Sequence, residues 1–306
     1  MKVAVLLNAK AGQLDRKVCE ERAREIVDAC RSHGIDATAT LCEPARLTET
    51  ARKLAREGGV EGVIAAGGDG TVSAIAAGLV DTDVVLGVVP LGTLNHFSKD
   101  LGIRDLETAI EAIASGNTAR IDVGEVNGRV FINNSSIGLY PEAVVHRDVE
   151  RRTHKRGKWP AMARAAIRIL LRFPLLHVAI GLAGKVFSAR TPFVFVGNNE
   201  YETGVTNLGS RKRIDRGTLG VYTVRATSRL KMFWLVLRQI FSRDTPPDFE
   251  VHAVDRADIV TNKRHLRVAL DGEVVRMSPP LHYRARPGAL RVFAPVAVAG
   301  TAGEAA

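Results

Sequence analysis

The pentapeptide Gly67-Gly68-Asp69-Gly70-Thr71 constrains the fold of this chain more than any other segment. It follows the apolar run 60–66 and leads directly into the small, mostly apolar residues 72–79. This order predicts a strand, a tight glycine turn and the N-terminus of a helix. Glycines let the backbone approach an anion, and the free N–H groups at a helix N-terminus favour phosphate. The segment therefore predicts an α/β unit with a phosphate-binding turn.

Asp69 adds a second requirement, because a carboxylate in this turn would repel a bare phosphate. The repulsion is removed if a divalent cation bridges the two groups, or if the carboxylate acts on a nucleophile instead. We therefore expect a magnesium nucleotide as the ligand, with Asp69 reaching Mg²⁺ directly or through water. The alternative is an ordinary glycine turn in which Asp69 caps the helix.

Two further polar loops follow apolar runs. Residues 8–12 come directly after the run 3–7, and residues 90–103 come directly after the run 84–89. Open α/β sheets bind ligands outside the carboxyl ends of their strands, so three such loops at one sheet edge predict a nucleotide site.

The first part of the chain alternates between strand and helix patterns. Helical spacing covers residues 14–33, 45–57 and 106–114, and strand-like runs cover 35–41, 60–66 and 84–89. Such alternation is typical of a doubly wound, mostly parallel sheet. We expect an N-terminal nucleotide-binding α/β domain over residues 1–118.

After residue 118 the pattern changes. Asn127-Gly128 between the runs 121–126 and 130–133 predicts a β-hairpin. Further short strands are predicted over 177–182, 186–189, 193–196, 219–224, 249–254, 257–261 and 266–270. Evenly spaced short strands indicate a C-terminal β-sandwich, which we place at 119–286. The final run 289–295 is expected to return to the first domain, which residues 287–298 would complete.

Three motifs, in this order, resemble the diacylglycerol kinase catalytic family: Asn8-x-x-x-Gly12, Gly67-Gly68-Asp69-Gly70-Thr71 and Pro90-Leu91-Gly92-Thr93-x-Asn95. Leu270-Asp271-Gly272-Glu273 is similar to that family's late Asp-Gly-Glu motif. The glycine motif alone is shared with NAD kinases, so the Pro-Leu-Gly-Thr loop discriminates between them. The resemblance, which covers most of the chain, implies the same two domains and an ATP- and Mg²⁺-dependent transfer of the γ-phosphate to a lipid hydroxyl, diacylglycerol-like or sphingoid-like.

The resemblance and the loop chemistry together give a set of expected contacts. The expected nucleotide contacts are Asn8, Thr40, Gly67, Gly68, Asp69, Gly70, Thr71, Thr93 and Asn95. Lys10, Lys17 and Lys99 are candidate contacts for phosphate or a lipid headgroup, with His96 beside the acceptor.

Glu273 is the candidate general base by its match to the family motif, with Asp271 as its partner. Two carboxylates two residues apart on a strand face the same side, where one can bind while the pKa of the other rises. The alternative is a simple polar turn, since Asp-Gly is an ordinary hairpin signal.

The chain departs from the family pattern at two places. His96 replaces the aspartate that usually follows the loop asparagine, which leaves the acceptor lipid open. Some bacterial members hold a structural metal at an Asp-Gly turn of the sandwich, where this chain has Asp215-Arg216-Gly217. We expect that metal to be absent or rearranged, with Asp215 as a weak substitute ligand.

The net charge of +10 concentrates in two stretches that mix basic, aliphatic and aromatic residues, 146–172 and 229–243. Basic amphipathic helices of this kind bind anionic phospholipid, although their apolar faces could equally pack on the core. Nucleic-acid binding is not expected, since aromatic residues make up only 5% and no nucleic-acid module is recognisable.

The compartment is predicted from cysteines and apolar runs. Cys19, Cys30 and Cys42 lack metal-type spacing and are expected to be reduced core thiols. The run 3–7 is too short for a signal peptide, and no window approaches about 18 apolar residues, the length of a membrane span. We expect a cytoplasmic protein, peripherally associated with the inner face of the membrane, with a homodimer as one possible assembly.

Three functions stay open at this point. The first is a lipid kinase. The second is an NAD kinase-like phosphotransferase, which leaves the basic segments and the Pro90–Asn95 loop unexplained. The third is a nucleotide- or lipid-binding regulator that has lost efficient turnover, a reading supported by His96 and Arg216.

Overall fold

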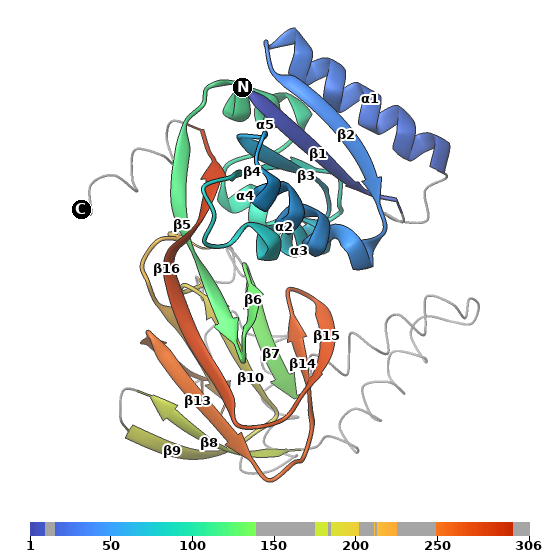
Figure 1. Ribbon diagram of the computed structural model, residues 1–306. Helices are drawn as coiled ribbons and strands as arrows, with labels where there is room; N and C mark the ends of the chain where they lie inside the picture. Colours follow the sequence, from blue (N-terminus) through green and yellow to red (C-terminus); the bar gives the residue numbers. More distant parts are fainter. Residues whose placement is uncertain are drawn as a thin grey trace, which may run out of the picture.

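The computed structural model describes residues 1–9, 16–138, 175–182, 185–201, 211, 213–224 and 249–295. Within these ranges the chain forms an α/β unit and a β unit, joined by two long strands (Figure 1). Lys10 and the two basic segments, 146–172 and 229–243, lie outside the described residues.

The α/β unit is built on four parallel strands in the order β2-β1-β3-β4. Their bounds are Lys2–Asn8 for β1, Asp36–Cys42 for β2, Gly62–Gly67 for β3 and Val85–Pro90 for β4. The helices are α1 (Arg16–Ser32), η2 (Pro44–Arg46), α2 (Leu47–Glu57), α3 (Asp69–Leu79), α4 (His96–Asp100) and α5 (Leu106–Ala114). Helix α1 packs with α5, and α2 packs with α3, so helices cover both faces as predicted for a doubly wound sheet.

The central strands explain why their sequences read as unbroken apolar runs. All six residues of β3 are buried, as are five consecutive residues of β1. A parallel strand with helices on both faces has no side that faces solvent. Polar residues alternating with apolar ones would therefore be buried, which costs free energy. Cys19, Cys30 and Cys42 are buried and not disulfide-bonded, and burial raises the pKa of Cys30 to about 11.

The β unit is an antiparallel sandwich. One of its sheets has six strands in the order β12-β11-β10-β7-β14-β15. Their bounds are Phe249–Val254 (β12), Leu219–Val224 (β11), Phe193–Asn198 (β10), Asn134–Gly138 (β7), Leu266–Leu270 (β14) and Glu273–Met277 (β15). The facing sheet contains β8 (Leu176–Leu182), β9 (Lys185–Thr191) and β13 (Arg256–Thr261). Buried apolar side chains, with Phe131 and Tyr283 among them, fill the space between the sheets.

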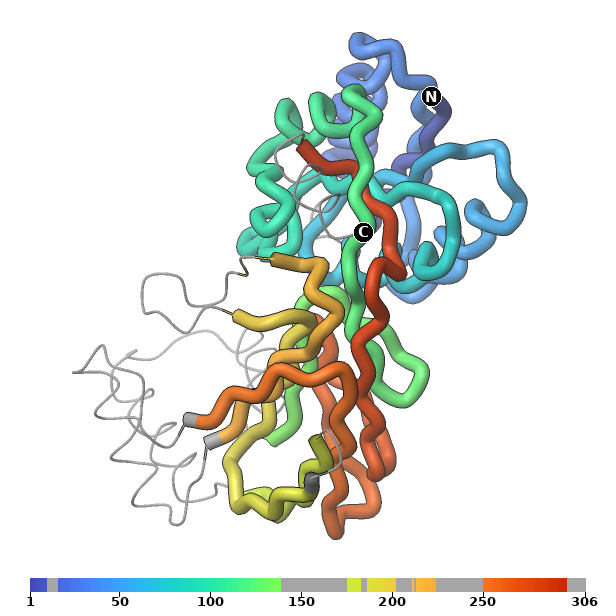
Figure 2. The backbone as a smooth tube through the Cα atoms, turned by 90° about the vertical axis from the view of Figure 1, so that its left-hand side faces the viewer, coloured from blue at the N-terminus to red at the C-terminus, as the bar shows by residue number. Residues whose placement is uncertain are grey.

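Strands β5 (Thr118–Val126) and β16 (Leu281–Phe293) connect the two units, and β6 (Arg129–Phe131) pairs with β5. Strand β16 pairs with β13 at its start and with β4 near its end, and it lies antiparallel to β5 (Figure 2). A single ten-stranded sheet therefore runs through both units. The predicted architecture, a doubly wound α/β domain with a β-sandwich, is confirmed.

Two strands were not predicted. Strand β7 begins Asn134-Ser135-Ser136, which carries no apolar alternation, and all three residues owe their place to pairing with β10 and β14. Strand β15 begins directly after the Asp271-Gly272 turn and pairs with β14, whereas the sequence pattern offers a hairpin turn there only as an alternative.

Gly78 provides a test of how tightly α3 packs on α2. Alanine in a helix normally stabilises by about 1 kcal/mol relative to glycine. A Cβ at Gly78, however, would lie 2.5 Å from the carbonyl oxygen of Thr48 and 2.8 Å from Cβ of Ala51. We expect Gly78→Ala to lower the free energy of unfolding by about 1–3 kcal/mol in urea titrations, because the helices must separate.

Gly70→Ala is the matched control in the same helix. The nearest heavy atom to its new Cβ would be Oε1 of Glu273, at an ordinary 3.6 Å. Its unfolding free energy should equal or exceed that of the wild type. A Gly78→Ala protein as stable as the Gly70→Ala protein would contradict the packing described here.

Candidate functional site

The predicted phosphate turn has the expected backbone. Strand β3 ends at Gly67, and α3 begins at Asp69 with Gly68 as an extended N-cap residue. Because no side chain caps this helix, its first amides are available to a ligand. The alternative in which Asp69 is the N-cap is wrong, since Asp69 is already the first helical residue.

The second loop packs directly on the first. The backbone N–H of Leu91 donates to the carbonyl of Gly67 at 3.0 Å. A Cβ on Gly92 would lie only 2.6 Å from Cα of Gly68, so glycine is required where the two loops touch. Asn95 is left-handed (φ 49°), and its side-chain amide bonds both the N–H and the carbonyl of Gly92, at 3.0 and 2.7 Å. Asn95 therefore shapes this loop.

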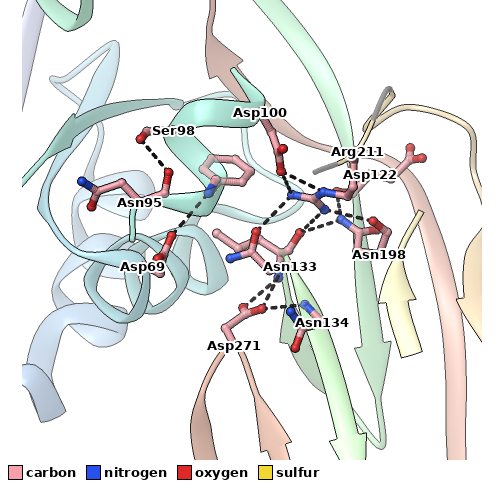
Figure 3. Close-up of polar contacts among 12 residues, drawn as sticks. Asp69, Asn95, Ser98, Asp100, Asp122, Asn133, Asn134, Asn198, Arg211 and Asp271 are labelled. Carbon is pink, nitrogen blue, oxygen red and sulfur yellow. Dashed lines mark hydrogen bonds and ion pairs between the residues drawn. The ribbon is translucent and has the colours of Figure 1, made fainter. Parts of the chain in front are cut away.

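The structure brings part of the predicted nucleotide set together. Nδ2 of Asn8, at the end of β1, donates to Oγ1 of Thr71 over 3.5 Å. Oδ1 of half-buried Asp69 accepts the backbone N–H of Phe97 at 3.3 Å (Figure 3). Residues from β1, the β3–α3 turn and α4 thus meet at the carboxyl ends of neighbouring strands.

The other predicted contacts within the described residues have exposed side chains. Thr93, His96 and Lys99 are exposed on the second loop and α4, and Lys17 is exposed on α1. Thr40 is exposed on β2, an edge strand that β1 separates from β3.

The late Asp-Gly-Glu segment differs from the prediction in its backbone. Leu270 of β14 pairs with Glu273 of β15, which leaves Asp271 and Gly272 as a two-residue turn with φ of 46° and 88°. The prediction that Asp271 and Glu273 share one face of a strand is therefore wrong. The turn alternative describes the backbone correctly, yet the turn also carries both carboxylates to α3.

The carboxylate of Asp271 accepts four hydrogen bonds, of which Figure 3 shows those from the backbone of residues 132–134. Oδ2 accepts from Oγ of Ser73 on α3, at 2.5 Å, and from the N–H of Ile132, at 2.9 Å. Oδ1 accepts from the N–H groups of Asn133 and Asn134, at 2.8 and 3.0 Å. Burial raises the pKa of Asp271, and these bonds oppose the rise. Both oxygens are fully used, so Asp271 anchors the turn.

Glu273 is placed differently. Its residue is exposed, and its Oε1 lies 3.6 Å from the position that a Cβ on Gly70 would take, beside the first turn of α3. Within the described chain its carboxylate accepts no hydrogen bond and forms no ion pair. Desolvation of the carboxyl group, followed by the negative charge of Asp271, raises the pKa of Glu273. Such a carboxylate accepts a proton more readily than an ordinary glutamate does.

Sequence reasoning missed a buried arginine that links the units. The side chain of Arg211 is 0% exposed and donates to Oδ2 of Asp100 on α4 through Nε and Nη2, at 2.9 and 2.6 Å. Its other bonds go to the carbonyls of Ile132 and Asn198 and to Oδ1 of Asn133 (Figure 3). Asn133 also donates its N–H to Asp271, so the network runs from α4 to the Asp271 turn.

No local pattern marks this network, because Asp100 and Arg211 are 111 residues apart. The usable signal would have been two oppositely charged residues far apart in the sequence. That signal is too common to select this pair.

The turn at which some family members hold a structural metal carries arginine side chains in this chain. Nε and Nη2 of Arg213 each lie 2.9 Å from the carboxylate of Asp215 and hold its pKa below the usual range. Arg216 lies 3.6 Å from Glu200. Among the described residues no group of three or more His, Cys, Asp or Glu is placed to hold a metal ion. The residues present do not fit a structural metal at Asp215.

Among the described residues no helix is long and apolar enough to cross a bilayer. The predicted lipid contact Lys10 lies outside those residues, so its role stays a prediction.

The Asp100–Arg211 pair provides a stability test. Removing one partner of a buried ion pair leaves an uncompensated charge, so Arg211→Gln and Asp100→Asn should each lose about 3–5 kcal/mol of unfolding free energy in urea. The exposed pair Arg52–Glu49 is the control, and Arg52→Gln should cost less than about 1 kcal/mol. Equal losses at both pairs would show that the Arg211 network does not hold the units together.

Comparison with known proteins places the chain in a family. Residues 2–126 match the model of the "Diacylglycerol kinase catalytic domain", and residues 135–294 match that of the "YegS C-terminal NAD kinase beta sandwich-like domain". The chain is 30% identical over 261 residues to the "Probable lipid kinase YegS-like" of Pseudomonas aeruginosa, covering 80% of this chain and 81% of that protein.

Two further matches define the extent of the likeness. The "Uncharacterized protein sll0036" of Synechocystis is 28% identical over 240 residues, which is 76% of this chain and 55% of that protein. A crystal structure of a diacylglycerol kinase from Bacillus anthracis shares the fold, with a TM-score of 0.68 at 23% identity over 97% of this chain and 98% of that one. With both domains matched in order and the motif loops converging on α3, the chain belongs to the diacylglycerol kinase family, among members that carry the YegS-type C-terminal β-sandwich.

Proposed function

We propose that this protein transfers the γ-phosphate of ATP, with Mg²⁺, to the hydroxyl of a diacylglycerol-like or sphingoid-like lipid. The observation that carries the proposal is the position of Glu273, a carboxylate without a partner in the described chain, beside the uncapped first turn of α3. A proton acceptor next to a phosphate cradle is the arrangement that phosphoryl transfer to an alcohol requires.

The geometry of the cradle supports the proposed binding of phosphate. The N–H groups of Gly68, Asp69 and Gly70, which have no acceptor within the described chain, favour phosphate oxygens, whereas the N–H of Thr71 already donates to the carbonyl of Gly68 at 2.9 Å. The contact between Gly68 and Gly92 lets two loops surround the phosphates. Asn8 and Thr71 add side-chain polar groups to the same edge.

Asp69 fits a magnesium nucleotide. Its Oδ1 accepts the N–H of Phe97, which fixes the carboxylate and leaves Oδ2 for a metal ion or its water. Bound Mg²⁺ would neutralise charge on the phosphates.

Glu273 is proposed to accept the proton of the acceptor hydroxyl. Its raised pKa makes the carboxylate a stronger base than an ordinary glutamate. Asp271 is not proposed as a base, because all its acceptor positions are occupied by Ser73 and three backbone amides. It would act as a positioning residue for Glu273.

An NAD kinase-like activity is the second candidate, since the matched C-terminal model is itself described as NAD kinase sandwich-like. The acceptor in that case is a soluble nucleotide. A membrane-peripheral location in the cytoplasm, with anionic phospholipid bound by the segments 146–172 and 229–243, is proposed only for the lipid kinase.

Single variants test the assignment. Purified protein is incubated with radiolabelled ATP, Mg²⁺ and micelles that contain diacylglycerol, monoacylglycerol, sphingosine or phosphatidylglycerol, and separately with NAD. Asp69→Ala and Glu273→Gln should each reduce transfer to the lipid by at least about 100-fold, because a metal contact or the base is lost. Glu111→Gln, on the exposed face of α5, should keep wild-type turnover.

If radiolabel enters NAD and none of the lipids, the NAD kinase-like activity replaces the lipid kinase as the proposed function. ATP binding without transfer to any acceptor would favour a regulator.

The pH dependence tests the role of Glu273. A base must be deprotonated, and the folded protein raises the pKa of this carboxyl group. The value of kcat/KM should therefore fall, as the pH decreases, through an apparent pKa above the ordinary glutamate value of about 4.3. This acid limb should be absent from the residual activity of Glu273→Gln. A limb that persists in that variant would assign the base to another group.

A further inference from the structure

An open cavity of about 420 Å³ lies at the junction of the two units, away from the candidate site. Four arginines line it, together with Asp81 and residues 285 and 287–289. The arginines come from three strands: Arg120 from β5, Arg284 and Arg286 from β16, and Arg256 from β13.

The cavity is distinct from the phosphate turn. Asp81 follows the C-terminal end of α3, whereas Asp69 begins that helix. Eleven helical residues span about 16 Å, and none of the predicted nucleotide or catalytic residues lines the cavity.

A buried carboxylate holds the bulge of β16 that lines the cavity. The register of β16 against β5 shifts between Arg286 and Leu290, and Gly288 in this bulge has a φ of 58°. Asp122, only 2% exposed, accepts the N–H of Gly288 at 2.9 Å and that of Gly217 at 2.5 Å. The bulge is therefore a fixed feature of the fold.

Two of the four arginines are neutralised. Glu125 accepts two bonds from Arg284 and one from Arg286, each at 2.9 Å, and Asp81 pairs with Arg286. Burial raises the pKa of Glu125, but the bonds from these arginines outweigh that effect and hold the pKa below its usual range. Two carboxylates thus offset two guanidinium groups.

The other two arginines keep their charge. Arg256 stands directly opposite Arg284 across β13 and β16, and Arg120 stands opposite Arg291 across β5 and β16. Like charges in directly opposed positions destabilise a sheet. Within the described chain Arg256 forms no hydrogen bond or ion pair, and Arg120 donates to the uncharged carbonyl of Gly288 at 3.3 Å. The cavity therefore carries two uncompensated positive charges.

We propose that this cavity is a second anion site that binds a phosphate monoester dianion through Arg120 and Arg256. Guanidinium groups present paired N–H donors that match phosphate oxygens, and two free cations match a dianion. The monoester can belong to a soluble molecule or to the headgroup of a phosphorylated lipid. The inference does not rest on the proposed kinase activity.

The experiment uses the full-length protein with a non-hydrolysable ATP analogue and Mg²⁺ present, so that the phosphate turn is occupied. Glycerol 3-phosphate is titrated by calorimetry, and sedimentation with phosphatidylcholine vesicles, with and without phosphatidic acid, tests the lipid form. The variants are Arg120→Gln, Arg256→Gln and the double change. The control is Arg267→Gln, which removes one member of another opposed exposed pair, Arg267 and Arg276, outside the cavity.

The double variant should bind at least about tenfold more weakly than the wild type in the arm that shows binding, since charged hydrogen bonds are lost. The control should keep wild-type binding. If the double variant loses only the binding of glycerol 3-phosphate measured by calorimetry, the ligand is a soluble monoester. If it loses only the binding to vesicles that contain phosphatidic acid, the ligand is a lipid headgroup.

Wild-type binding by the double variant in both arms, or no binding by the wild type in either arm, overturns the proposal. Thermal unfolding gives a second readout that excludes misfolding. Without ligand, Arg256→Gln should unfold at the wild-type temperature or above it, because the opposed charge on Arg284 is relieved.

Discussion

The carboxylate of Asp271 joins the two units at the point where the chemistry is proposed to occur. It belongs to a hairpin turn of the β-sandwich, yet one of its bonds comes from Ser73 on α3 and the others come from amides that precede and begin β7. Because those four donors point at one side chain, the turn cannot shift without leaving several of them unsatisfied. Glu273, two residues on, is thereby held beside the first turn of α3.

The Arg211 network extends this constraint to the second loop. Asn133 bonds Asp271 through its backbone and Arg211 through its side chain, and Arg211 bonds Asp100 at the end of α4. The helix that follows the Gly92–Asn95 loop is therefore connected to the turn that carries Glu273. A guanidinium group buried between domains serves here as a fixed internal cation, held in place by carbonyl and amide oxygens as well as by one carboxylate.

The arginines near the junction of the units differ in how far their charges are compensated, and each environment has a different consequence. Arg211 is buried and saturated, which makes it structural. Arg284 and Arg286 share Glu125, which ties β16 to β5 at the junction of the units. Arg120 and Arg256 stay uncompensated on an open cavity, which is the state that favours an external anion. Net charge alone, +10 for the chain, distinguishes none of these.

The sequence by itself determined the elements whose signal is local. Apolar runs ending in glycine specified β3, the turn and the start of α3, because burial on both faces and an anion-compatible backbone leave few other residue choices. The family motifs likewise marked Asp69 and Glu273. Tertiary structure alone decided that Asp271 is an anchor in a turn, that polar residues 134–136 form a central strand, and that Arg211 lies between the units. Each of these depends on partners more than 75 residues away or on pairing across a sheet, and such partners leave no periodicity in the sequence.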